Sequence, residues 1–204
     1  NDTFEGSQES GMFEVTKKFG SVTVNIPANA HVGDTINVTG TLKDEDGKPW
    51  SGEPVEVKVN GKTYKTTTDG NGTYKVPVNN LEEGTNYISV TVPSSKVNVQ
   101  PVEKNLTVTK KNTNITIQNL KDVPIGTTAT ITGTLTDENK NKIANATVRV
   151  KVGNEEKTVR TDKDGKYNAS FAADEVGPKL VNVYYDGNDT FEGSQESGMF
   201  EVTK

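Results

Sequence analysis

Apolar and polar residues alternate along most of the chain, and this pattern predicts β-strands. The alternation is clear at residues 22–26, 55–59, 88–92 and 106–108, where Val, Ile or Leu occupies every second position. A period of two places one face of each strand against a core and the other face in water. No stretch has the 3.6-residue period of an amphipathic helix. The pattern therefore predicts an all-β, antiparallel protein.

Turn sequences divide these runs at short, regular intervals. They read "DEDGKP" at 44–49, "NGK" at 60–62, "DGNG" at 69–72 and "EEG" at 82–84. Gly, Asn and Asp are the residues that tight turns between strands need. Their spacing gives about seven short strands in each stretch of roughly 90 to 100 residues, which is typical of the immunoglobulin-like β-sandwich.

The chain repeats itself. At an offset of 93 residues, "VGDTINVTGTLKDEDGK" at 32–48 aligns with "IGTTATITGTLTDENKN" at 125–141. The same offset aligns "TDGNGTY" at 68–74 with "TDKDGKY" at 161–167. One inserted residue then makes the offset 94. Repetition at a fixed period indicates tandem modules.

The first seventeen residues, "NDTFEGSQESGMFEVTK", are identical to residues 188–204. We therefore expect residues 1–17 to be the closing strand of a preceding repeat in a longer parent. Residues 18–110 and 111–204 are then two complete Ig-like modules. With seven strands, the first and last of each module run in the same direction, so the chain enters a module at one end and leaves at the other. The short, polar connections predict a semi-rigid rod.

Composition narrows the possible functions. The net charge is -5, and no basic stripe is visible, which argues against binding nucleic acid. No run of about 18 apolar residues is present, so we expect no membrane insertion. The chain has no cysteine, which excludes disulfides and thiol chemistry.

The residues give little support for catalysis. His31 is the single histidine, and a catalytic histidine needs a nucleophile or an orienting partner, so we expect a structural or surface role. The acidic groups at 44–46, 69 and 162–164 could suggest calcium loops. They lack the downstream glutamate of such loops, and the same letters form Asx turns. We expect no enzyme, no metal and no cofactor.

The motifs resemble a known repeat family. A strand ending in "TGTL", then "TD..G.Y", and a closing "YYDGNDTFEGS" are similar to the tandem bacterial-type Ig-like repeats of surface adhesins. The adhesin-like proteins of methanogenic archaea are the most similar. The resemblance covers residues 19–204 and implies extracellular display at the cell surface, a stalk or adhesive role, and no catalysis. Residues 93–105 depart from the pattern.

Three aromatic residues are candidates for a binding face. By alternation, Tyr64 and Tyr184 point outward, and Trp50 offers a ring that could stack on a sugar. The repeat places Ile143 at the position of Trp50, so this ring could equally be an apolar plug at the start of a strand. Tyr74 and Tyr167 coincide in the two repeats, which predicts rings packed at the sandwich edge with bonded hydroxyls.

The chain is rich in N-x-[ST] triplets, which suit a glycosylated surface protein. Exposed strand faces made of Asn and Thr would produce such triplets without any glycan, so both interpretations stay open. The triplets begin at Asn1 and at seven later glycosylation candidates: Asn37, Asn71, Asn105, Asn114, Asn145, Asn168 and Asn188.

The duplicated segment also suggests strand exchange. Without its own module, this segment would expose the apolar side chains of Phe4, Phe13 and Val15. A neighbouring copy could bind the segment in place of its own closing strand. Alternatively, the segment lies along a neighbouring surface. The sequence favours a spacer that extends an adhesive region from the cell and contacts other repeats of its own chain. The alternative is that the modules themselves bind a glycan or a surface protein on a partner cell.

Overall fold

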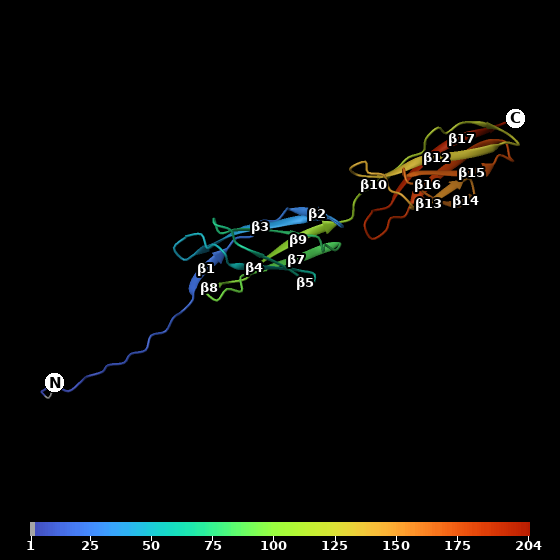
Figure 1. The fold of residues 1–204 in the computed structure, drawn as a ribbon. Helices are drawn as coiled ribbons and strands as arrows, with labels where there is room; N and C mark the ends of the chain where they lie inside the picture. Colours follow the sequence, from blue (N-terminus) through green and yellow to red (C-terminus); the bar gives the residue numbers. More distant parts are fainter. Residues whose placement is uncertain (1–2) are drawn as a thin grey trace. The chain divides into compact units, whose positions relative to one another are not determined.

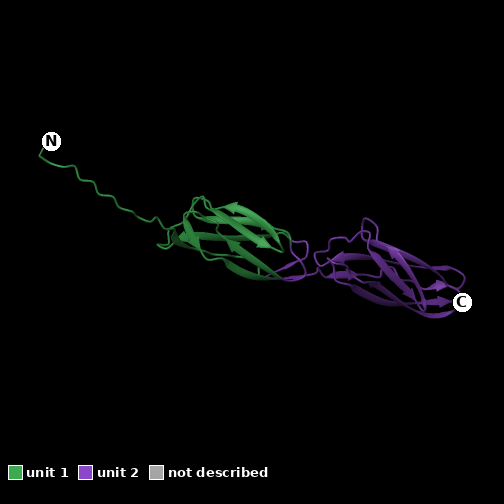
Figure 2. Cartoon of the chain, turned by 90° about the horizontal axis from the view of Figure 1, so that it is seen from below, with its two compact units in different colours: residues 1–28, 35–80, 86–106 green, residues 29–34, 81–85, 107–204 purple. Residues whose placement is uncertain are grey.

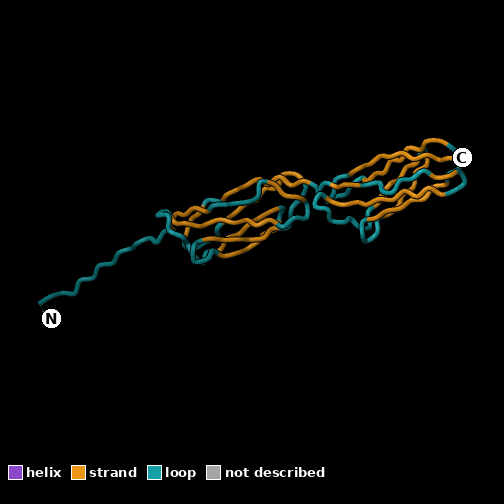
Figure 3. The backbone as a smooth tube through the Cα atoms, turned by 90° about the horizontal axis from the view of Figure 1, so that it is seen from above, coloured by secondary structure: helices purple, strands orange, loops and turns teal. Residues whose placement is uncertain are grey.

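All regular structure is β in the computed structural model, which describes residues 3–204. Figure 3 shows strands and loops and no helix over these residues, as the alternation predicted. No described segment is therefore a helix long and apolar enough to cross a membrane. The strands of the first repeat are β1 (Lys18–Val22), β2 (Asn29–His31), β3 (Ile36–Asp44), β4 (Pro54–Val59), β5 (Lys62–Thr67), β6 (Thr73–Val78), β7 (Gly84–Thr91), β8 (Val97–Val99) and β9 (Val102–Thr109).

The second repeat follows the same order. Its strands are β10 (Thr113–Ile115), β11 (Val123–Pro124), β12 (Thr128–Asp137), β13 (Thr147–Val152), β14 (Glu155–Arg160), β15 (Lys166–Ala172), β16 (Gly177–Tyr185) and β17 (Ser194–Thr203).

Each repeat forms two sheets. In the first, a sheet of order β6-β3-β1-β8 faces a sheet of order β2-β9-β7-β4-β5. In the second, the orders are β10-β12-β15 and β11-β17-β16-β13-β14 (Figure 1). The chain is thus built of tandem Ig-like β-sandwiches, and we call them the first and the second sandwich.

The opening strand of each sandwich is shared between its two sheets. In the second sandwich, β10 pairs with β12, and the chain then crosses over so that β11 pairs with β17 of the other sheet. The pairing of β11 with β17 is parallel, as is that of β2 with β9. Counting the split opening strand β10–β11 once gives seven strands in the second sandwich. The first and last strands of each sandwich run in the same direction, as expected.

Branched aliphatic side chains fill both cores. Val38, Val57 and Val90 are fully buried in the first sandwich, and Val148 and Val183 are fully buried in the second. They occupy the inward positions of strands whose outward neighbours are polar or charged. Burying such side chains stabilises each sandwich by about 1.5 to 3 kcal/mol per residue before entropy is counted.

The Asn-Gly turn between β4 and β5 shows why the turn sequences were reliable. Asn60 and Gly61 both have positive φ, at 48° and 79°. A two-residue hairpin with a type I′ turn requires this conformation at both positions, and Asn followed by Gly adopts it most readily. Register from Val59↔Lys62 to Pro54↔Thr67 follows from that turn.

The chain packs into two compact units (Figure 2). One contains residues 1–28, 35–80 and 86–106, and the other contains residues 29–34, 81–85 and 107–204. Two short segments of the first repeat therefore group with the second unit.

Residues 4–17 form no strand, although the same letters form β17 near the other end of the chain. An extended segment with no neighbouring strand leaves its backbone groups and apolar side chains in water, whereas β17 pairs with β16 along nine residue pairs. That residues 1–17 are the closing strand of a preceding repeat stays a prediction. Figure 1 shows this segment without an arrow before β1.

The closing loop of the first repeat, which departs from the motif, forms an additional strand. β8 pairs in parallel with β1, and Ser94 and Lys96 contact Glu53, a carboxylate that is only 3% exposed. The Ser94 hydroxyl donates to Glu53 at 2.5 Å, and Lys96 Nζ lies 3.7 Å from its other oxygen. The second repeat has Ala146 at the position of Glu53, so this buried polar group belongs to the first sandwich.

Candidate functional site

Three cross-strand pairs form the surface that we call the outer β16–β17 face, on the solvent side of the five-stranded sheet of the second sandwich. They are Leu180↔Met199, Asn182↔Ser197 and Tyr184↔Gln195. Alternation puts them outward, because Val181, Val183 and Tyr185 on β16 and Phe200 and Val202 on β17 are buried.

The apolar end of this face is the pair Leu180 and Met199. Their side chains are 63% and 61% exposed although they lie directly opposite each other. Single exposed apolar side chains are ordinary on protein surfaces. Two in direct register form a small apolar spot of the kind that a partner protein could cover.

The aromatic end of the face is built around Arg149. This residue lies opposite Tyr184 in the pairing of β13 with β16, and its guanidinium carbon is 4.6 Å from the centre of the tyrosine ring. Its Nε and Nη2 donate to the two oxygens of Asp186 at 2.8 and 2.9 Å. A third contact, from Nη1 to Glu156, is 3.5 Å long. The guanidinium is thus held over the ring by a bidentate carboxylate.

This pairing perturbs both ionisable groups. Hydrogen bonding to Asp186 raises the pKa of Arg149 above its ordinary value, and the attraction of both carboxylates adds to the effect. Hydrogen bonding to Arg149 lowers the pKa of Asp186 below its ordinary value. Because both groups are exposed, the pair fixes the position of the arginine more than it adds stability. The guanidinium also covers one face of the ring that a sugar would need for stacking.

The three aromatic candidates do not form one site on a common strand pair. Tyr184 lies in the second sandwich, whereas Trp50 and Tyr64 lie in the first. The Trp50 carbonyl accepts a hydrogen bond from Thr68 at 2.6 Å. Thr68 lies four residues beyond Tyr64, which is about 13 Å along an extended chain. The bond to Thr68 therefore does not place Trp50 beside Tyr64.

Trp50 and Tyr64 are both half-buried and held by local contacts. Trp50 and Ile143 make equivalent backbone hydrogen bonds in the two repeats. The Trp50 amide donates to the Leu42 carbonyl, and the Ile143 amide donates to the Leu135 carbonyl. This placement favours the apolar plug over a sugar platform. The Tyr64 hydroxyl donates to Asn79 at 3.1 Å, and Lys62 Nζ lies 4.9 Å from the ring centre.

The acidic turns hold their own backbone. Oδ1 of Asp69 accepts hydrogen bonds from the amides of Asn71 and Thr73, both at 2.9 Å. Asp162 makes the equivalent bonds to the amides of Asp164 and Lys166. These amide bonds lower the pKa of Asp162, and for Asp69 a bond from the Thr73 hydroxyl has the largest effect. Among the described residues, no three metal-ligating side chains gather into a cluster.

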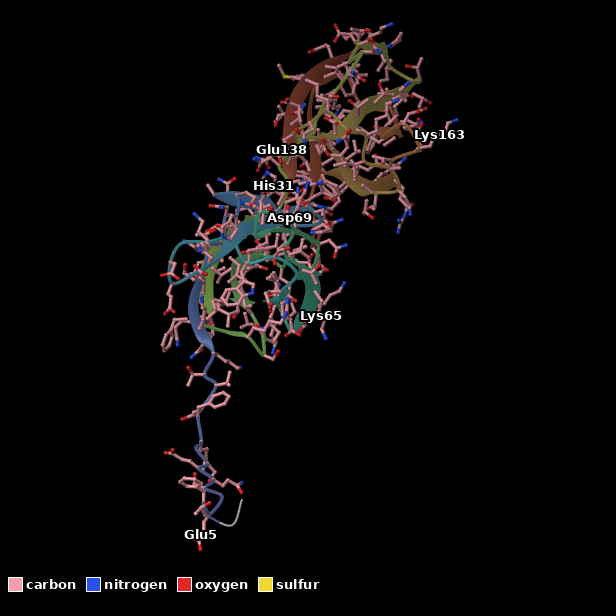
Figure 4. The ribbon with its side chains drawn as sticks, turned by 60° about the vertical axis from the view of Figure 1, so that its left-hand side comes forward. Glu5, His31, Lys65, Asp69, Glu138 and Lys163 are labelled. Atoms are coloured by element: carbon pink, nitrogen blue, oxygen red, sulfur yellow. The ribbon has the colours of Figure 1, made fainter. Side chains whose placement is uncertain are left out.

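His31 lies on β2, in the segment that groups with the second compact unit. Its Nε2 is 2.8 Å from Glu138 Oε1, and Figure 4 labels both residues. Its Nδ1 faces the carbonyl of Thr109 at 3.3 Å. The Thr109 hydroxyl oxygen also lies 3.1 Å from Nδ1, so the ring is held between Thr109 and Glu138.

The glycosylation candidates are accessible. All seven from Asn37 to Asn188 are exposed, and the triplet at Asn1 lies outside the described residues. Two of the side chains already have a structural role. Asn188 Oδ1 accepts from the amides of Thr190 and Phe191 at 2.8 Å, and Asn145 Oδ1 accepts from Arg160 at 3.1 Å.

A cleft of about 270 Å³ opens in the second sandwich between its sheets. Phe171 and Phe200 line its floor, and Glu155, Asp174 and Glu175 are on its rim. Its size is at the lower limit for small-molecule pockets. The carboxylates on the rim would disfavour an anionic ligand.

Sequence reasoning found Tyr184 but missed Arg149, Asp186, Leu180 and Met199. Leu180 could have been found, because it shares the parity of Tyr184 along β16. Arg149 and Met199 could not, because their placement depends on the register between strands that are far apart in the sequence.

Comparison with known proteins agrees with this architecture. Residues 130–197 match the sequence profile of the carboxypeptidase regulatory-like domain. No curated protein matches the chain in sequence. Among solved structures, the chain is similar to invasin, a bacterial integrin-binding protein, with 22% identity and a TM-score of 0.55. The alignment covers 89% of this chain and 39% of the invasin chain, so the chain spans about two fifths of that relative.

Two further solved structures are similar at lower TM-scores. A 1.5-MDa bacterial ice-binding adhesin has 21% identity and a TM-score of 0.40, with 93% of this chain and 65% of the other covered. The adhesin InvE of Yersinia pseudotuberculosis has 18% identity and a TM-score of 0.37, with 89% and 58% covered. The chain therefore carries, in residues 130–197, a stretch similar to the carboxypeptidase regulatory-like domain, and its fold is that of the Ig-like modules of invasin.

Proposed function

We propose that this chain is a non-catalytic stalk or spacer segment of a cell-surface adhesin, displayed outside the cell. The observation that supports this most directly is the parallel pairing of first and last strands in each sandwich. A module entered at one end and left at the other adds length for each repeat. Such a module can be repeated without rearranging its neighbours.

Further features support the proposal. Each sandwich has its own buried core of apolar side chains, and this core stabilises the module from within. The acidic side chains of the tight turns bond to their own backbone, and the His31 ring is held between Glu138 and Thr109. The solved adhesins share the fold, and the resemblance of the repeat motifs to archaeal adhesin-like proteins belongs to the same proposal. The partners of such a segment are other repeats of the same chain.

The spacer function can be tested by changing reach. Cells coated with a polymer layer of fixed thickness would display a reporter binding domain. The domain would be joined to the cell surface through zero, one, two or three copies of the 204-residue chain. Capture of ligand-coated beads is expected to rise with each copy. X-ray scattering of the purified fusions is expected to show a maximum dimension that grows steadily with copy number. Capture and dimension that do not change with copy number would contradict the proposal.

A second candidate function is binding of a partner-cell surface protein by the outer β16–β17 face. The exposed Leu180–Met199 pair favours it, together with an arginine held over the ring of Tyr184. A protein partner fits this face better than a glycan, because Arg149 covers one face of the ring. The first sandwich has Glu56 and Thr91 at the positions of Arg149 and Tyr184, so this function would belong to the second repeat alone.

Binding of the isolated chain to a glycan array and to intact partner cells tests this alternative. If the face binds, the double variant L180S/M199S should lose cell binding, and M12S should keep it. Met12 is the counterpart of Met199 in the duplicated segment and is 99% exposed. Equal binding by both variants would contradict a role for the face.

A further inference from the structure

The cleft in the second sandwich lies at one end of the module, where β13 and β15 end and β14 and β16 begin. Its volume is about 270 Å³. The two rings on its floor, Phe171 and Phe200, come from opposite sheets, and both are buried. Such a floor offers apolar contact area to a small molecule, because aromatic side chains present large flat surfaces.

The first repeat closes the equivalent end with asparagine side chains. Asn60 Nδ2 donates to the carbonyl of Asn80 and to Oδ1 of Asn86, both at 2.7 Å. These bonds join the β4–β5 turn to the segment after β6 and to β7. The second repeat has no asparagine at the three corresponding positions, which hold Gly153, Ala173 and Lys179. All three line the cleft, so the same bridge cannot form there.

Two further positions differ between the repeats at this end. The first repeat has Leu81, which is 7% exposed, where the second repeat has Asp174, which is exposed. The first repeat also has Lys62 where the second has Glu155. The second repeat thus replaces an apolar and a basic side chain by two carboxylates, and both of these line the cleft.

The rim of the cleft keeps a negative charge after its ion pairs are counted. Lys179 Nζ lies 3.3 Å from Glu175 Oε2, and Lys157 Nζ lies 3.9 Å from Glu155 Oε1. Asp174 forms no ion pair with any described residue of the chain. The charge of Asp174 is therefore the one on the rim that a ligand could pair with.

We propose that this cleft binds a small organic cation that carries an ammonium group on an aromatic or aliphatic body. The body would lie on the rings of Phe171 and Phe200, which supply apolar contact area. The ammonium would stay at the rim beside Asp174, where water still reaches it. Because this ion pair is exposed, it adds selectivity more than affinity, and we expect a Kd of about 1 to 10 mM.

The order of floor and rim favours a free amine over a lysine of a partner protein. A free amine can enter with its apolar end first and leave its charge beside the carboxylates. A lysine side chain on a partner presents its ammonium first. It would carry the charge away from the rim carboxylates and towards the apolar floor, where losing water is costly.

An NMR titration of the full chain with related probes tests the chemistry of the site. Phenethylammonium is the cation, phenethyl alcohol is its neutral counterpart, and hydrocinnamate is its anionic counterpart. The cation is expected to shift the amide signals of residues 153–155 and 172–175, which line the cleft. The alcohol should bind about twofold to fivefold more weakly, since an exposed ion pair contributes little, and the anion more weakly still.

A fourth probe separates a free amine from a protein side chain. Lysine blocked at both ends of its backbone represents the lysine of a partner. It is expected to give no saturable shifts up to about 50 mM, several times the upper expected Kd of the cation. Binding of blocked lysine that is as tight as that of phenethylammonium would overturn the assignment to a free amine.

A pair of charge variants tests the role of Asp174. D174N should weaken binding of phenethylammonium about twofold to fivefold and leave binding of phenethyl alcohol unchanged. The control is D164N, which removes the same charge from the turn at the other end of β15. It should leave the binding of both probes unchanged. Equal affinity of D174N and D164N for the cation would overturn the inference.

A third variant tests the cleft itself. D174L introduces the residue of the first repeat, and the leucine should occupy the cleft and abolish binding of both the cation and the alcohol. Its circular dichroism spectrum should match that of the wild type, and if it does not fold, the comparison of D174N with D164N still decides. An absence of shifts at residues 153–155 and 172–175 in the wild type at about 50 mM cation would overturn the inference. The result is independent of the spacer function, because the titration does not measure reach.

Discussion

The Tyr167 hydroxyl donates a hydrogen bond to the Thr116 carbonyl at 2.5 Å, and Gly133, directly opposite Tyr167 in the β12–β15 ladder, leaves room for it. A Cβ atom at Gly133 would lie 1.8 Å from the Thr116 oxygen and 2.5 Å from the tyrosine hydroxyl. The first sandwich repeats the arrangement. There, Tyr74 bonds to the Thr23 carbonyl at 2.7 Å beside Gly40. The opening strand of each sandwich is thus fastened to the sheet by a tyrosine, and the glycine makes the close approach possible.

The substitution G133A should therefore destabilise the second sandwich. The added methyl group overlaps backbone, so the opening strand must move and the tyrosine bond must break, at a cost of about 1 to 3 kcal/mol or more. Urea unfolding monitored by circular dichroism would measure the loss in the free energy of unfolding. The control is G70A, where a Cβ atom meets nothing within 4 Å. Equal stability of G133A and G70A would contradict this role of the glycine.

The hydrogen bond between Tyr167 and Thr116 has parts that the sequence predicts and a part that it does not. The Gly of "TGTL" and the Tyr of "TD..G.Y" are visible as repeated letters, and the bonded hydroxyl of Tyr167 was predicted. Their joint purpose was not, because it depends on Thr116, which approaches through tertiary packing. Local periodicity predicts strands and faces well, whereas contacts such as Arg149 with Tyr184 need the pairing register. Residues 7–16 carry the same letters as β17, and the letters alone do not say whether a partner strand is present.

Alkaline pH should weaken the first sandwich through Tyr74. Burial raises the pKa of Tyr74 to about 12, whereas an unfolded tyrosine titrates near 10. The unfolded chain therefore loses this proton first, so stability is complete below about pH 10 and falls as pH rises towards 12. The loss approaches at most about 3 kcal/mol. Lysines titrate in the same range, so the measurement is the difference between the wild type and Y74F. Parallel pH profiles for the two proteins would contradict the prediction.

The duplicated segment offers a stability experiment with an internal control. F200A removes a buried ring from β17 and should cost about 3 to 5 kcal/mol in the free energy of unfolding. F13A changes the same letter in the same sequence, but the ring is exposed, so the cost should lie within about 0.5 kcal/mol of zero. Urea unfolding of dilute protein measures both. A cost for F13A comparable to that for F200A would show that residues 1–17 are packed in the monomer.

Removing the arginine on the outer β16–β17 face should change the titration of one carboxylate. The guanidinium of Arg149 holds the pKa of Asp186 below its ordinary value through two hydrogen bonds. In R149A that pKa should rise towards the ordinary value, whereas R149K should give an intermediate result, because an ammonium keeps the charge and loses the bidentate geometry. Carboxyl-detected NMR from about pH 2 to about pH 6, a range that brackets the ordinary aspartate pKa of about 3.9, would follow the shift.

Asp162 supplies the control for that titration, because the amides of its own turn lower its pKa and Arg149 has no part in it. Its pKa should be the same in R149A as in the wild type. The sign of the linked stability follows from the direction of the shift. A lowered folded pKa contributes stability above the unfolded pKa and loses it as pH falls through the folded value. The wild type should therefore lose this contribution on acidification, and R149A should not. An Asp186 titration that is identical in the two proteins would show that the arginine does not bind this carboxylate in solution.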